Sequence, residues 1–163
     1  MSNSFPEKLH LDGAVYDMFA YPLCSYLAQF PDWPRFPNWP GNSRGYSATW
    51  AVIDDVLCLT GMRAPVEEPL AALFPGIAGP VPATWVSGII DVHRGERRHV
   101  GYPSRRIFDD EVYLEISCGR VLREWRFDLR GVPDQTDEEL KLSLPRFLWP
   151  ARLRDDPDPV EPK

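Results

Sequence analysis

The clearest pattern in this chain is an alternation of two kinds of side chain along residues 45–59, GYSATWAVIDDVLCL. A period of two residues is typical of a β-strand, whose successive side chains point to opposite faces. Asp54 and Asp55 interrupt the alternation, and aspartate tolerates the left-handed backbone of a tight turn. The segment therefore predicts one β-hairpin, and both of its faces are apolar enough for a central position in a sheet.

Similar patterns predict two further hairpins. Asp12 and Gly13 form a dipeptide that favours a two-residue turn, which predicts a hairpin over residues 8–19. Residues 109–129 alternate around Gly119 and predict another hairpin. Its first strand is expected to turn one set of side chains inward, namely Val112, Leu114, Ile116 and Cys118. Its second strand is expected to do the same with Val121, Arg123, Trp125, Phe127 and Leu129.

Residues 83–93, ATWVSGIIDVH, also have the character of a strand. One face of this strand is expected to carry Trp85, Ser87, Ile89 and Asp91. Gly88 in its middle predicts a bulge or a close backbone approach. Residues 94–96 then predict a turn of the chain.

Short helices are predicted at residues 22–30 and within residues 67–76, because each segment places proline in the first helical turn and Gly76 follows the end of the second. A third is predicted near residues 134–145, with Thr136 as its cap. Seven or so short strands joined by turns indicate an all-β or β-dominated α+β fold, an antiparallel meander forming a small barrel or a sandwich. The 163 residues fit a single domain over residues 1–150. The charged, proline-rich residues 151–163 predict a disordered tail.

Residues 31–45, PDWPRFPNWPGNSRG, form a proline-aromatic strap, with a proline at every third position from 31 to 40. Prolines donate no amide hydrogen, so a continuous strand is excluded. Trp33, Phe36 and Trp39 recur every three residues, and a polyproline-like strap would place them on one side. Two interpretations stay open. Either the rings close one end of the core, or they form an exposed surface that recruits a partner.

The net charge and the cysteine content limit the kinds of function and partner that we expect for this protein. A net charge of −6 disfavours nucleic acid as a partner. No apolar run approaches the roughly 20 residues that span a bilayer, and the N-terminal residues do not resemble a secretory signal, so we expect a cytoplasmic protein without a membrane partner. Three cysteines argue against a disulfide framework.

A local exception to the acidic balance is the stretch HRGERRHVGYPSRR, residues 93–106. It concentrates five arginines, namely Arg94, Arg97, Arg98, Arg105 and Arg106. One interpretation is the solvated rim of a hairpin. The other is a contact for an anion or an acidic partner.

A search for chemistry assigns no catalytic residue. The sequence has no G-x-S-x-G elbow, P-loop or dinucleotide glycine pattern. His93 and His99 flank a predicted turn, but their spacing to Cys58 or Cys118 matches no zinc pattern, so they are interpreted as solvent-facing and no metal or cofactor is expected. The adjacent aspartates 54–55 and 109–110 are interpreted as turn residues.

Asp91 is the more unusual carboxylate, because it shares the strand face of Trp85. If that face is internal, Asp91 is buried and needs a partner, for which Arg123 is the candidate. The pair is either structural or, with Trp50 and Trp85, lines a ligand pocket inside a barrel.

The order of these signals resembles a group of small, largely uncharacterised bacterial proteins. The matching pieces span roughly residues 9–123 and are LDGAVYDMFAYPLCSYL, GYSATWAVIDDVLCL, LFPG, ATWVSGIIDVHRGE and GYPSRRIFDDEVYLEISCGRV. The resemblance implies a β-rich fold and no active site. It also implies a role as an accessory or immunity partner of a bacterial toxin.

Two functions follow as expectations. The first is a non-enzymatic interaction domain that binds and inhibits a basic protein such as a toxin, using Trp33, Phe36, Trp39, Asp54 and Asp55 as its contact surface. Its acidic charge would steer that partner at encounter. The alternative is a small-molecule-binding barrel or enzyme with an aromatic-lined pocket.

Overall fold

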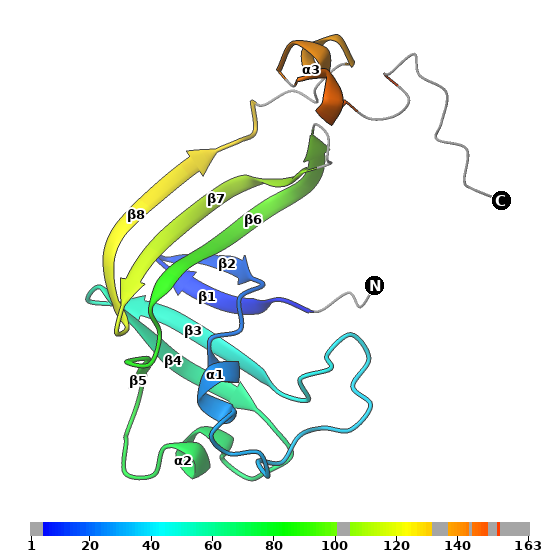
Figure 1. Ribbon diagram of the computed structural model, residues 1–163. Coiled ribbons are helices and arrows are strands. Elements are labelled where there is room, and N and C mark those ends of the chain that lie inside the picture. The colour runs from blue at the N-terminus through cyan, green and yellow to red at the C-terminus, as the bar shows by residue number, and fades with distance from the viewer. Residues whose placement is uncertain (1–4, 101–104, 132–136, 144, 150–152, 154–163) are drawn as a thin grey trace, which may run out of the picture. The chain divides into compact units, whose positions relative to one another are not determined.

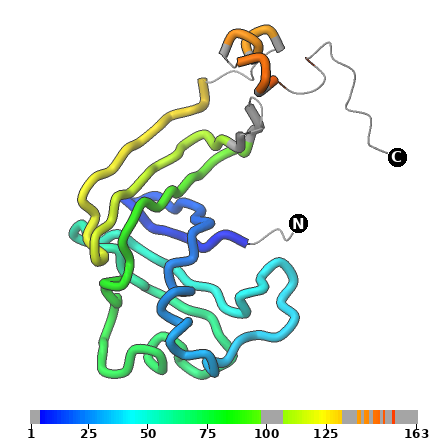
Figure 2. Tube along the Cα trace, in the orientation of Figure 1, coloured from blue at the N-terminus to red at the C-terminus, as the bar shows by residue number. Residues whose placement is uncertain are grey.

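The computed structural model describes residues 5–100, 105–131, 137–143, 145–149 and 153. The chain divides into two compact units, residues 1–94 with 111–127, and residues 95–110 with 128–163. The first unit holds most of the strands. Figure 2 draws the Cα trace of the whole chain. All but one residue of the predicted tail, 151–163, lies outside the described residues.

The strands form a closed, mixed β-barrel, and Figure 1 labels each of them. Seven strands pair in the order β3-β1-β2-β6-β7-β8-β4, and β4 pairs back with β3 to close the ring. The short β5 pairs with β4 only. The strands are β1 (Glu7–Leu11), β2 (Ala14–Met18), β3 (Ser47–Ile53), β4 (Val56–Arg63), β5 (Val81–Pro82), β6 (Gly88–Val100), β7 (Arg105–Ser117) and β8 (Arg120–Asp128). The predicted barrel is confirmed, and the sandwich is excluded.

The helices are short, as expected from the proline positions. Pro22 precedes α1 (Leu23–Leu27), and Pro69 begins α2 (Pro69–Leu73). The second unit contains α3 (Asp137–Ser143) and a 3-10 turn, η1 (Arg146–Leu148). The predicted cap of α3, Thr136, lies outside the described residues.

The predicted hairpins over residues 8–19 and 45–59 are confirmed, and the second strand of the latter continues to Arg63. Asp54 and Asp55 adopt φ values of 49° and 60°, which is the left-handed geometry of a two-residue hairpin turn. The alternation of β3 is also as predicted, because Ala48 and Trp50 are buried while the side chains between them are half-buried. One pairing departs from an antiparallel meander, since β1 runs parallel to β3.

The strand predicted over residues 83–93 begins later than expected. Gly88, with φ +124°, opens β6 and does not sit in its middle. The turn predicted at residues 94–96 is wrong, because β6 continues to Val100. Gly95 instead makes room for the Asp109 side chain, which accepts a hydrogen bond from the Glu96 amide at 2.9 Å. Asp109 and Asp110 therefore lie in β7, and not in a turn.

The inward face predicted for β8 is also wrong. Trp125 and Phe127 are 37% and 46% exposed. The Phe127 ring packs edge-on against Tyr113, and Arg123 donates to Glu115 at 2.5 Å. Tyr113 and Glu115 belong to the less buried face of β7, because Val112, Leu114 and Ile116 are buried on the other face. β8 is exposed along nearly its whole length, so neither of its faces is buried.

The core of the first unit is aromatic where the two short helices meet the strands. Trp50 of β3 is fully buried and packs against Trp85, whose indole nitrogen donates to the carbonyl of Pro22 at 2.9 Å. The Phe74 ring stacks on Trp85 with the centroids 5.8 Å apart, and the Tyr26 ring packs against Trp85 at a tilt, with the centroids 4.7 Å apart. Large rings with satisfied polar atoms account for much of the buried area here.

Candidate functional site

The proline-aromatic strap is folded back on itself by a close backbone contact. The Phe36 amide donates to the carbonyl of Gly45 at 2.7 Å. Gly45 has φ +72°, and a Cβ atom there would lie 2.6 Å from the Arg35 Cβ and 2.9 Å from the Phe36 oxygen. Only glycine fits this position, so the strap enters β3 in a fixed direction.

The three strap rings do not share one side. Trp33 packs against the hydrophobic core, as the core-closing interpretation predicted. Phe36 and Trp39 instead meet edge-to-face, with ring centroids 5.3 Å apart and planes at 84°. The strap therefore divides its rings, with Trp33 serving the core and the other two serving a surface feature.

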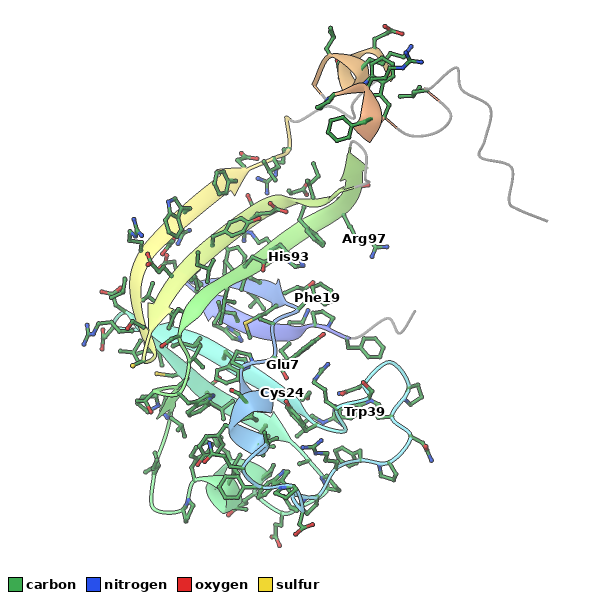
Figure 3. All side chains as sticks on the ribbon, viewed as in Figure 1. Glu7, Phe19, Cys24, Trp39, His93 and Arg97 are labelled. Atoms are coloured by element: carbon green, nitrogen blue, oxygen red, sulfur yellow. The ribbon has the colours of Figure 1, made fainter. Side chains whose placement is uncertain are left out.

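That surface feature is an open groove of about 280 Å³, the strap groove, lined by Phe36, Pro37, Trp39 and Arg63. Arg63, at the end of β4, holds its guanidinium 5.3 Å from the Trp39 ring centroid. Trp39 is labelled in Figure 3. A cation over an indole face is stabilised by the ring's electron density, and the exposed guanidinium keeps donors for a ligand.

Asp54 and Asp55 do not belong to the same surface. The strap leads into the first residue of β3, whereas the aspartates form the turn at the far end of that strand. The Asp55 carbonyl accepts the Val121 amide at 2.8 Å, so the aspartate turn abuts the β7–β8 turn. The predicted interaction surface is thus separated into two ends of the β3–β4 hairpin.

A buried polar cluster lies where β1 meets the end of the strap, and sequence reasoning missed it. Glu7 of β1 is 1% exposed and accepts a hydrogen bond from the Trp50 indole nitrogen at 2.8 Å. The Arg44 guanidinium lies 3.9 Å from its other carboxylate oxygen and stacks over the Tyr21 ring at 3.6 Å. The signal was present, because Glu7 shares a strand face with Leu9 and Leu11.

The electrostatics of this cluster are unusual. Burial raises the pKa of the Glu7 carboxyl from 4.5 to about 7, although the Trp50 hydrogen bond and Arg44 partly offset this. Among the polar atoms buried by the described residues, Glu7 Oε1, Arg44 Nε and Asn42 Oδ1 have no hydrogen-bond partner in that part of the chain. Such orphaned groups weaken a fold unless they serve another purpose.

Cys24 and Tyr46 border the same cluster, and Figure 3 labels Cys24 with Glu7. The Cys24 sulfur lies 2.8 Å from the Tyr46 hydroxyl. Burial, and next the Cys24 contact, raise the pKa of the Tyr46 phenol above its ordinary range. All three cysteines are free thiols, with Cys58 buried and Cys24 and Cys118 exposed.

The four residues predicted to line an internal pocket do not come together. Trp50 and Trp85 touch in the core, with ring centroids 6.4 Å apart. Asp91 is exposed, so the expectation of a buried carboxylate is wrong. Arg123 is exposed and pairs with Glu115, not with Asp91. The predicted Asp91–Arg123 pair is therefore absent.

The basic stretch is only partly described. Arg94 lies over the Tyr16 ring at 5.3 Å, and Arg97 is exposed. The side chains of Arg98, Arg105 and Arg106 lie outside the described residues, as does that of His99. A contact of these arginines with an anion or an acidic partner stays a prediction.

His93 corrects the expectation of a solvent-facing imidazole. It is 5% exposed and stacks on Phe19 at 5.2 Å. Burial lowers its pKa, while Asp91 and Asp17 act in the opposite direction. Its ring serves the side-chain packing between β2 and β6.

The described residues contain no group of three histidine, cysteine or acidic side chains placed to hold a metal ion. None of the helices in that part of the chain has the length and apolar character needed to cross a membrane. No protein-family model matches the sequence, and neither the curated proteins nor the solved structures include a significant match.

Proposed function

We propose that this chain is a non-enzymatic protein-interaction domain, and that its strap groove is the primary contact. The observation that carries the proposal is the groove that the half-buried rings of Phe36 and Trp39 form beside the exposed Arg63. Aromatic and arginine side chains dominate the binding energy of protein interfaces. An exposed site of this composition on a closed barrel is suited to recognition more than to chemistry.

The rigidity of the strap supports the same proposal. The backbone hydrogen bond between Phe36 and Gly45, and the edge-to-face packing of Phe36 on Trp39, order the groove before a partner binds. A pre-ordered surface loses little conformational entropy on binding. The net charge of −6 would favour encounter with a basic protein, as an immunity-type inhibitor of a basic toxin requires.

Photo-crosslinking in the native cell tests the proposal. A benzophenone amino acid replaces Trp39 in one variant and Ile89, which is 65% exposed outside the groove, in a matched control. We expect one discrete adduct from position 39 and none from position 89. Adducts of equal yield from both positions, or none from either, would overturn the proposal.

Once the partner is captured, Trp39→Ala is expected to weaken its binding about tenfold. The substitution removes the indole ring that a partner would contact. It also removes the ring that holds the Arg63 guanidinium in place. Isothermal titration calorimetry measures the change, with Ile89→Ala as the control. Equal affinities of the two variants would contradict the assignment of the groove.

A further inference from the structure

A second groove, between β4 and α2, has a different chemistry from the strap groove. It encloses about 440 Å³, and its walls include the side chains of Met62, Leu70, Ile77 and Pro80. Ile77 is 47% exposed although it is apolar. Most of these side chains offer aliphatic surface, so the groove favours a ligand with a hydrocarbon portion.

Glu68 is the one charged residue that lines this groove. No ion pair joins its carboxylate to another residue in the described part of the chain. The groove therefore combines apolar walls with a single free negative charge.

The backbone at Glu68 adds a separate observation. Its φ of 47° and ψ of 62° lie in the left-handed region, which glutamate rarely adopts, and the following residue is Pro69. A residue before proline is normally extended. Strain of this kind tends to occur where a fold fixes a side chain for binding.

We propose that this groove binds a lysine or arginine side chain of a partner protein. The aliphatic stem of such a side chain lies along Leu70 and Ile77, and its cationic end pairs with Glu68. The net charge of −6 attracts the same ligand from a distance. This inference rests on the proposed function in one respect, namely that the cationic side chain belongs to a partner protein.

Other occupants fit the groove less well. An anion would be repelled by Glu68. A purely apolar side chain would desolvate that carboxylate without giving it a partner, which costs free energy. Charge complementarity thus favours an amphipathic cation.

The test is an NMR titration of the intact chain, observed at the methyl groups of Leu70 and Ile77. The probe is N-acetyl-lysine methylamide, and N-acetyl-norleucine methylamide is the uncharged comparison. We expect saturable methyl shifts with the lysine probe and much smaller ones with norleucine. Equal shifts from both probes, or none from the lysine probe, would overturn the proposal.

Two variants test whether the charge of Glu68 contributes to lysine binding, one as the test and one as its matched control. Glu68→Gln is expected to weaken lysine binding about threefold, the range of an exposed ion pair. Glu67→Gln removes the same charge one residue away, outside the groove, and should leave binding unchanged. Equal weakening by both variants would show that net charge alone attracts the probe, which contradicts the proposal.

An occluding variant tests the apolar part of the site. Ala71 is exposed and lines the groove, so Ala71→Trp should fill it without disturbing the core and should abolish the lysine-induced shifts. Unchanged shifts would place the probe elsewhere and overturn the proposal. If the lysine probe does not bind but crosslinking at position 39 gives a discrete adduct, this inference is wrong and the proposed function stands. If the lysine probe binds but position 39 gives no adduct, only the proposed function is wrong.

Discussion

The free energy of unfolding is expected to fall by about 3 kcal/mol as the pH rises from about 4 to about 8. The cause is Glu7, whose carboxyl has a pKa of about 7 in the folded chain and 4.5 as its ordinary value. Between these two values the unfolded chain releases the Glu7 proton while the folded chain retains it. The stabilisation is therefore fully present below about pH 4.5 and is lost as the pH rises through about 7.

Glu7→Gln isolates this contribution. Glutamine keeps an oxygen that accepts the Trp50 indole hydrogen bond, and it carries no charge at any pH. The variant should lose most of the decline and should be more stable than the wild type at pH 8. Urea unfolding at several pH values, followed by tryptophan fluorescence, measures the effect.

Glu67→Gln is the control for Glu7, because Glu67 is an exposed carboxylate. Its pH profile should follow that of the wild type. If Glu7→Gln retained the full decline, Arg44 would be compensating the Glu7 charge, and the assignment would be wrong.

Gly119→Ala is expected to destabilise the chain by about 3 kcal/mol or more. Gly119 has φ +85°, and a Cβ atom there would lie 2.8 Å from the carbonyl oxygen of Ala83. The neighbouring backbone cannot withdraw easily, because the Gly119 amide donates to Val86 and its carbonyl accepts from Leu57, each at 2.8 Å.

Gly13→Ala is a matched control for Gly119→Ala. In both two-residue turns the glycine follows a residue at positive φ, which is Asp12 before Gly13 and Cys118 before Gly119. Gly13 has φ +77°, but nothing lies within 4 Å of a Cβ atom there. This variant should cost only the conformational penalty, about 1–2 kcal/mol. Thermal and urea unfolding of both variants compare the two, and equal losses would contradict the role given to the Ala83 contact.

Local turn chemistry explains why the hairpins were predictable. Asp12-Gly13 and Asp54-Asp55 both adopt positive φ as their residue types favour. Once each turn is fixed, the period of two residues assigns the faces of the adjoining strands. The prolines at positions 22 and 69 located both helices of the first unit in the same way.

Pairing between distant strands explains what was not predictable. The parallel pairing of β1 with β3 joins residues about 40 apart, and no local pattern specifies it. The exposure of Trp125 and Phe127 was not predictable either, because the alternation assigns only which residues share a face, and β8 is exposed along nearly its whole length. Asp91 was misplaced for a related reason, because Trp85 precedes β6 and does not define its inner face.

The candidate site was predicted in part. The three-residue spacing of the strap identified Phe36 and Trp39, but Arg63 joins them from the end of a different segment. Glu68 was not identified, because a single glutamate before a proline carries no motif.

Closure of the barrel has a consequence for how other chains can approach it. In the described part of the first unit, only β5 stands at an end of the strand order, and it has two residues, one of them Pro82. Each strand of the ring has a neighbour on both sides, although β8 meets β4 through a single residue pair, Val56 with Arg120. At the β5 edge, addition of a strand from another chain and the fibrous self-assembly that begins in the same way are both disfavoured, because the strand is short and Pro82 has no amide hydrogen to donate.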